Sequence, residues 1–173
     1  ALLSLAFGGL AVIGSPARRG DTEEGLLARL ERERNPVKRA KFEIRLGRLK
    51  LLQAIEAYDQ KDLVQGQQLL SAYLERMKSA WATLEGSGRE AHRRPQGFKE
   101  LDIALRQDGR LLEDLAHRVP FHDRSPVEKV AQEVEELRSR VLKALFPSER
   151  PRQRGSRFLS LSGPHISPEM VRG

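Results

Sequence analysis

The chain has no cysteine, few aromatic residues, and no stretch in which apolar and polar residues alternate as in a half-buried β-strand. Without cysteine it cannot form disulfides, use a thiol nucleophile or bind zinc through thiolates. Aromatic residues make up 5% of the 173 residues, whereas charged residues make up 32%. Apolar residues recur every three or four positions, a spacing typical of amphipathic helices. We therefore predict an all-α protein.

Motifs that would indicate an enzyme are also missing. The sequence contains no glycine-rich phosphate loop, dinucleotide fingerprint, zinc-protease helix or serine-nucleophile motif. Asp114 and His117 form a single acid-x-x-His spacing, whereas a di-iron helical site needs two such motifs and further acids. We therefore expect no catalytic residue, no cofactor and no metal. An enzyme or metal protein built on Asp108, Asp114 and His117 is the competing hypothesis.

The first residues are the most apolar part of the chain. Residues 2–13 are apolar apart from one serine and two glycines, and small residues follow as far as Ala17. Such a short apolar core before small residues is typical of a secretory signal, and it falls short of the roughly 20 residues that span a membrane. We expect residues 1–17 to be a signal-peptide-like or anchor segment of an exported (periplasmic or extracellular) or membrane-anchored protein. A buried helix of a cytoplasmic protein is the alternative.

Capping residues and prolines divide residues 18–147 into helices of one domain. We expect an antiparallel bundle of about four main helices, preceded by a short helix. The short helix is predicted from Asp21 or Thr22 to about Arg34. The main helices are predicted over about 36–60 after Asn35, 63–84 after Asp62, 98–118, and 126–146 after Ser125. Residues 148–173 are rich in proline, serine and arginine, so we expect a disordered basic tail.

The first two main helices carry small residues at Ala54 and Gly66, a tight turn at residues 61–63 and a large packing residue at Leu70. In these features the pair resembles one helix hairpin of a tetratricopeptide repeat, over roughly 30 residues, and departs from it at Tyr73, where that family has a small residue. No second copy occurs at the family's period of about 34 residues. The resemblance implies peptide or partner binding by a tetratricopeptide-like module.

Basic residues exceed acidic ones, 31 to 24, and the formal net charge is +7. A basic balance favours attraction to anionic surfaces. The candidate anion- or partner-binding residues are Arg89, Arg93, Arg94 and Lys99 in the loop before the third main helix, and Arg150, Arg152, Arg154 and Arg157 in the tail. Few aromatic residues lie among them, so a solvated loop and tail is the competing interpretation. The alternative function is a basic cytoplasmic protein that binds nucleic acid or another polyanion.

Asp108 stands on the leucine stripe of the helix predicted over 98–118. A buried acid there would mark a functional site. Alternatively, an arginine or Tyr58 satisfies its carboxylate, or the stripe turns it toward solvent beside Gly109; we favour these structural interpretations.

Together these features predict a noncatalytic helical interaction or scaffold protein, exported or associated with the cell envelope. The expected partner is another protein or an envelope component, and no residue pattern indicates a small-molecule substrate.

Overall fold

The computed structural model describes residues 22–147, and this part of the chain consists of helices and the loops that connect them, with no strand. The prediction of an all-α fold is therefore confirmed. The elements are α1 (Glu23–Arg32), α2 (Pro36–Asp59), α3 (Leu63–Glu85), α4 (Phe98–Arg118), the 3-10 turn η1 (Phe121–Asp123) and α5 (Ser125–Leu145).

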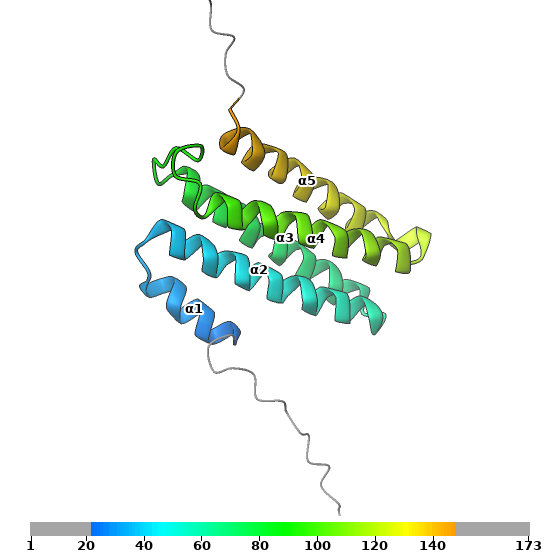
Figure 1. Cartoon of the computed structure of the whole chain (residues 1–173). Coiled ribbons are helices and arrows are strands. Elements are labelled where there is room, and N and C mark those ends of the chain that lie inside the picture. Colours follow the sequence, from blue (N-terminus) through cyan, green and yellow to red (C-terminus); the bar gives the residue numbers. More distant parts are fainter. Residues whose placement is uncertain (1–21, 148–173) are drawn as a thin grey trace, which may run out of the picture.

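Helices α2 to α5 lie side by side, and each runs in the opposite direction to the one before it (Figure 1). The most extensive contact joins α2 to α3, and the next joins α4 to α5. Helix α1 lies outside this group and packs chiefly on α2. The α2–α3 turn and the α4–α5 connector therefore meet at one end, whereas the loop of residues 86–97 lies at the other (Figure 1).

Side-chain caps begin three helices where the sequence places them. The Asn35 carboxamide oxygen accepts hydrogen bonds from the backbone N–H groups of Val37 and Lys38, at 3.0 and 3.3 Å. Asp62 Oδ1 accepts one from the Gln65 N–H at 3.0 Å, and Thr22 Oγ1 accepts one from the Gly25 N–H at 3.2 Å. Each cap satisfies N–H groups that the first turn leaves without a helical partner.

Two predicted helix boundaries are wrong. Ser125 does not cap α5: it is the first residue of that helix, because Arg124 already has helical backbone angles and leaves no extended residue to act as a cap. Helix α1 ends at Arg32 instead of near Arg34, because Glu33 is already extended (φ −81°, ψ 125°) before the Asn35 cap.

Two separate groups of buried apolar residues hold the described part together. The main core is shared by α2, α3, α4 and α5, and includes the fully buried side chains of Leu51, Tyr73, Met77 and Leu112. A smaller core of Leu26, Leu30 and Leu46 joins α1 to α2. Removing apolar surface from water is the main stabilising contribution of both groups.

Glycines permit the close contact between α2 and α3. A Cβ atom on Gly66 of α3 would lie 2.7 Å from ring carbons of Tyr58 on α2. A Cβ atom on Gly47 of α2 would lie 2.8 Å from the Met77 Cε of α3. The small residue at position 66, on which the tetratricopeptide resemblance partly rests, therefore has a packing role against Tyr58.

Candidate functional site: a cavity at one end of the bundle

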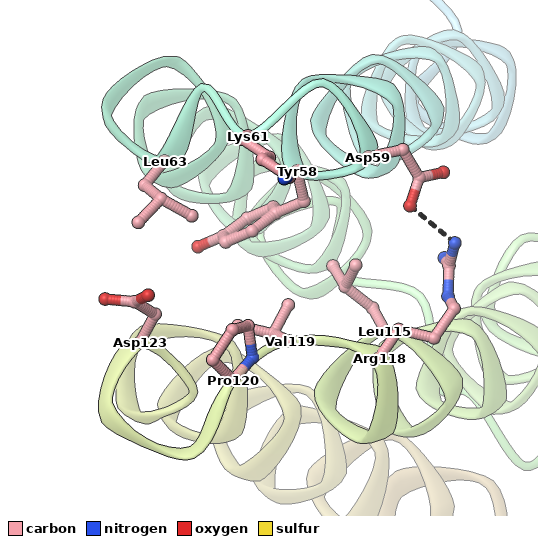
Figure 2. A pocket seen from close by; sticks show the side chains of 9 residues that line it. All are labelled: Tyr58, Asp59, Lys61, Leu63, Leu115, Arg118, Val119, Pro120 and Asp123. Atoms are coloured by element: carbon pink, nitrogen blue, oxygen red, sulfur yellow. Dashed lines mark hydrogen bonds and ion pairs between the residues drawn. The ribbon is translucent and has the colours of Figure 1, made fainter.

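A cavity of about 510 Å³ lies where the α2–α3 turn meets the α4–α5 connector. Figure 2 shows its lining side chains, which come from both halves of the bundle. Most of them are apolar or aromatic: Tyr58, Leu63, Leu115, Val119 and Pro120. The remaining lining residues are charged: Asp59, Lys61, Arg118 and Asp123. A concave site of this size that combines apolar side chains with a small number of polar ones is typical of a binding site. We call it the end cavity.

Tight backbone turns place these side chains. Lys61 adopts a left-handed conformation (φ 65°), and this lets the chain reverse between α2 and α3. On the other side, Pro120 follows the extended residue Val119, which ends α4. The two short connections bring the α2–α3 turn opposite the connector, so the cavity forms between them (Figure 2).

Among the lining residues of the end cavity, Tyr58 has the buried polar side-chain atom that lacks a hydrogen-bond partner within residues 22–147. Only 6% of the residue is exposed, and its hydroxyl has no hydrogen-bond partner within residues 22–147. Figure 2 shows the hydroxyl directed toward the gap between Leu63 and Asp123. Burial raises the pKa of the Tyr58 hydroxyl, and the negative charge of Asp123 raises it further. The hydroxyl is therefore a protonated donor at neutral pH.

Charged side chains stand around the end cavity. The Arg118 Nη1 donates to Asp59 Oδ1 at 2.6 Å, and this pair joins the end of α2 to the end of α4 (Figure 2). Asp123 Oδ2 lies 3.0 Å from the Nε2 of the exposed His122. The Arg118 and Asp59 side chains are each about half exposed, so their pair contributes little to stability.

Two large exposed apolar side chains follow lining residues of the end cavity in the sequence. Phe121 is 87% exposed and directly follows the lining residue Pro120, whereas Val64 is 69% exposed and directly follows the lining residue Leu63. Exposed aromatic side chains are enriched in protein–protein contact surfaces. Sequence reasoning placed Phe121 in a connector and missed this site; an aromatic residue between Pro120 and His122 in a polar loop was the available signal.

The predicted basic loop lies at the opposite end of the bundle. Arg89, Arg93 and Arg94 line a second cavity of about 350 Å³, while Lys99 is exposed in the first turn of α4. Glu90 lies in the same loop, and its carboxylate pairs with Arg93 at 2.9 Å. The four tail residues Arg150, Arg152, Arg154 and Arg157 lie outside the described residues.

The acid on the leucine stripe is an interior residue. Asp108 is fully buried, so the interpretation that it turns toward solvent is wrong. Its Oδ1 accepts a hydrogen bond from Arg48 of α2, and its Oδ2 has no partner among the described residues. Asp108 thus joins α4 to α2 through a residue that the sequence did not single out.

A second buried acid was missed from sequence. Glu43 of α2 is 4% exposed, and its carboxylate accepts hydrogen bonds from Arg76 and Ser79 of α3, each at 3.1 Å.

Within residues 22–147, histidine and acidic side chains nowhere gather in a group of three or more that could hold a metal ion. None of the helices there combines the length and apolar character needed to cross a membrane.

Because comparisons with known proteins found no match, any proposed function rests on the geometry of this structure. No family model, curated protein or solved structure matches this chain.

Proposed function

We propose that this chain is a noncatalytic helical interaction module that binds a partner protein at the end of the bundle that holds the end cavity. The observation that carries the proposal is the exposure of Phe121 and Val64, which directly follow the lining residues Pro120 and Leu63 of the end cavity in the sequence. Apolar and aromatic side chains in a concave surface are the groups that contribute most to protein–protein contacts. The helix-hairpin resemblance to tetratricopeptide repeats, which bind peptides, supports the same class of function.

Site-specific photocrosslinking tests this proposal. A photoreactive phenylalanine replaces Phe121 in the full chain, expressed in the organism that encodes it. The matched control replaces Phe146, which is 70% exposed at the opposite end. We expect a discrete crosslinked protein from position 121 alone. Equal crosslinking from both positions, or none from position 121, would contradict the proposal.

A binding measurement must then confirm the crosslinked partner. The identified protein is purified and titrated against the chain and its variants. We expect Phe121→Ser to weaken binding at least about tenfold, as loss of a central aromatic contact does, and Phe146→Ser to leave it unchanged. Equal affinities for the two variants would show that the crosslink reported proximity only.

Export or membrane anchoring is a further part of the proposal, and it is supported by the apolar composition of residues 2–13. Cell fractionation of a strain expressing the complete gene, with mass-spectrometric mapping of the amino terminus, tests it. A mature terminus near Arg18 in the exported fraction, or an uncleaved protein in the membrane fraction, is the expected result. An uncleaved cytoplasmic protein would overturn it.

Polyanion binding is the second candidate function, because three arginines of the 86–97 loop line one cavity. Replacing Arg89, Arg93 and Arg94 by glutamine removes these charges. Replacing the exposed Arg106, Arg110 and Arg140 removes the same number elsewhere. This function predicts nucleic-acid affinity that falls steeply with salt and is lost in the loop variant alone. Undetectable affinity at low salt would eliminate it.

A further inference from the structure

The cavity formed by the basic loop carries more positive than negative charge. Its volume is about 350 Å³, and it is lined by Ser87, Gly88, Arg89, Glu90, Arg93 and Arg94. Three guanidinium groups therefore share one concave surface with a single carboxylate, whereas the lining of the end cavity has two cations and two carboxylates. A concave surface lined by charge of one sign attracts ligands of the opposite sign. We call this second cavity the loop cavity.

Local turns bring the arginines of this loop together. Gly88, directly before the first of them, has a left-handed backbone (φ 67°), which glycine adopts readily. The backbone carbonyl of Glu90 accepts hydrogen bonds from the N–H groups of Arg93 and Arg94, at 3.1 and 2.9 Å. Ala91 is 5% exposed and belongs to the main core, so it attaches the loop to the bundle. The arginines of the loop cavity therefore stand on an anchored backbone.

Two of these arginines are not paired with an acid. Within residues 22–147, the ion pairs of this loop join Glu90 to Arg93 at 2.9 Å and to His92 at 3.7 Å. The guanidinium groups of Arg89 and Arg94 have no carboxylate partner there, so they are available to an anion from outside. The Arg89 Nε atom is covered, so a ligand meets this side chain through its terminal nitrogens.

The shape and charge of the guanidinium groups restrict the anion. Each group presents its donors in a planar fork that matches two oxygens of a carboxylate or a phosphate. A carboxylate has one charge and two oxygens, which satisfy only one fork. A phosphate monoester has close to two negative charges at neutral pH and three terminal oxygens, so two forks can share it. We infer that the loop cavity binds a phosphate monoester group on Arg89 and Arg94.

This site goes beyond both candidate functions. It lies at the opposite end of the bundle from the end cavity, so it does not depend on the proposed partner contact (Figure 1). A nucleic-acid surface follows a row of phosphodiesters with one charge each, whereas this loop gathers its cations in one cavity. The shared chemistry of its ligands is the monoester, in a soluble molecule or in a lipid headgroup.

Two small probes test the inference on the full chain. Methyl phosphate is a monoester, and dimethyl phosphate is a diester with one charge and one terminal oxygen fewer. Amide NMR signals of Gly88, Arg89 and Arg94 report binding, slightly above neutral pH and at constant ionic strength. We expect saturable shifts with methyl phosphate, and affinity at least about fivefold lower for the diester, because it loses a charge-assisted hydrogen bond. Absent shifts with methyl phosphate, or equal affinities, would overturn the inference.

Arginine variants locate the site. Arg89→Gln and Arg94→Gln should each weaken binding of methyl phosphate at least about fivefold, since each removes hydrogen bonds from a charged donor. Lys99→Gln is the matched control, because Lys99 is exposed in the first turn of α4 and does not line the loop cavity. An equal loss in Lys99→Gln would show attraction by overall charge only and would overturn the inference.

An acidic residue of the same cavity gives a test with the opposite sign. Glu90→Gln removes the carboxylate from the lining and releases its paired arginine. We expect methyl phosphate to bind about two- to fivefold more tightly, the range that an exposed charge interaction supplies. Glu113→Gln removes the same charge from an exposed position on α4 and should leave the affinity unchanged. Equal effects of the two variants would contradict a local site.

Vesicles identify the source of the phosphate. Phosphatidic acid presents a monoester headgroup, and phosphatidylcholine presents a diester. Sedimentation with phosphatidylcholine vesicles that requires added phosphatidic acid, and that Arg94→Gln abolishes, would place the monoester in a lipid. No sedimentation, together with bound methyl phosphate, would place it in a soluble molecule. Either result agrees with the inference.

The remaining outcomes separate this inference from the other proposals. Phe121→Ser should leave binding of methyl phosphate unchanged, because Phe121 follows α4 at the opposite end of the bundle (Figure 1). Failure of the loop cavity therefore leaves the interaction module standing, and the reverse also holds. An oligonucleotide without a terminal phosphate that binds the loop, when methyl phosphate does not, would support polyanion binding and overturn the inference.

Discussion

Asp108 shows how one residue links two helices inside the bundle. Its carboxylate is fully buried, and Arg48 reaches it from a partly exposed position on α2.

Replacing Arg48 by methionine leaves the carboxylate buried without a counter-charge, so we expect unfolding free energy to fall by about 3 kcal/mol. The Arg48→Met, Asp108→Leu double variant should come within about 1 kcal/mol of the parent, because an apolar pair replaces the ion pair. Urea unfolding of the single and double variants tests this; additive losses would contradict it.

Tyr73 gives the protein a pH dependence at the alkaline end. Burial raises the pKa of its hydroxyl above the ordinary value of 10.0, and the nearby Arg48 lowers it by less. The folded chain therefore keeps a proton that the unfolded chain loses above about pH 10. The stability that the protonated Tyr73 hydroxyl contributes to the folded state is complete below pH 10 and is lost as the pH rises further. Urea unfolding between about pH 9 and pH 11 should show a smaller loss of stability in Tyr73→Phe than in the parent. Identical slopes would contradict this.

At the scale of the element, Gly66 is tested best by comparison with Gly109. Alanine favours a helix over glycine by about 1 kcal/mol. At position 109 a Cβ atom meets nothing within 4 Å, so Gly109→Ala should stabilise the protein by up to about 1 kcal/mol. At position 66 the Cβ atom would lie 2.7 Å from the Tyr58 ring, and we expect Gly66→Ala to destabilise by about 1–3 kcal/mol. Thermal unfolding of both variants checks the opposite signs.

Helix positions could be predicted well because their signals are local. Asn35 and Asp62 are good caps in any tertiary context, and the structure uses both. The Ser125-Pro126 pair also predicts a capping serine, but Ser125 does not cap α5. Arg124, which follows η1, already has a helical conformation. Buried Glu43 could not be predicted, since its partners Arg76 and Ser79 lie on another helix. Contacts between helices depend on packing that periodicity does not encode.

At the scale of the whole molecule, the end cavity could not be predicted from the sequence either, because it depends on contacts between helices. Tyr58 of α2 and Leu63 of α3 lie on either side of the α2–α3 turn, while Leu115 lies in the last turns of α4 and Pro120 in the α4–α5 connector. The sequence identifies each of these residues as apolar or turn-forming. That they come together at one end of the bundle follows from the alternating helix directions (Figure 1). The basic loop was easier to predict because its arginines are neighbours in the chain.

The separate cores of α1 and of the other helices predict two levels of stability. Leu112 is fully buried in the main core, and Leu26 is 2% exposed in the core that joins α1 to α2. Leu112→Ala should lower the free energy of global unfolding by about 2–5 kcal/mol, because it opens space among four helices. Leu26→Ala should act mainly on α1, whose few contacts let it open without the other helices.

Amide hydrogen exchange measured by NMR distinguishes the two effects. We expect Leu112→Ala to lower protection of the slowest amides in α2 to α5, because those amides exchange through global unfolding. Leu26→Ala should lower protection in α1 and leave those slowest amides unchanged. Equal loss throughout in Leu26→Ala would show that α1 unfolds together with the main core, and that one cooperative unit spans all five helices. Local loss would show that α1 can leave the outer face of α2 while the end cavity, lined by residues of α2, α3, α4 and the segments that follow α2 and α4, stays intact.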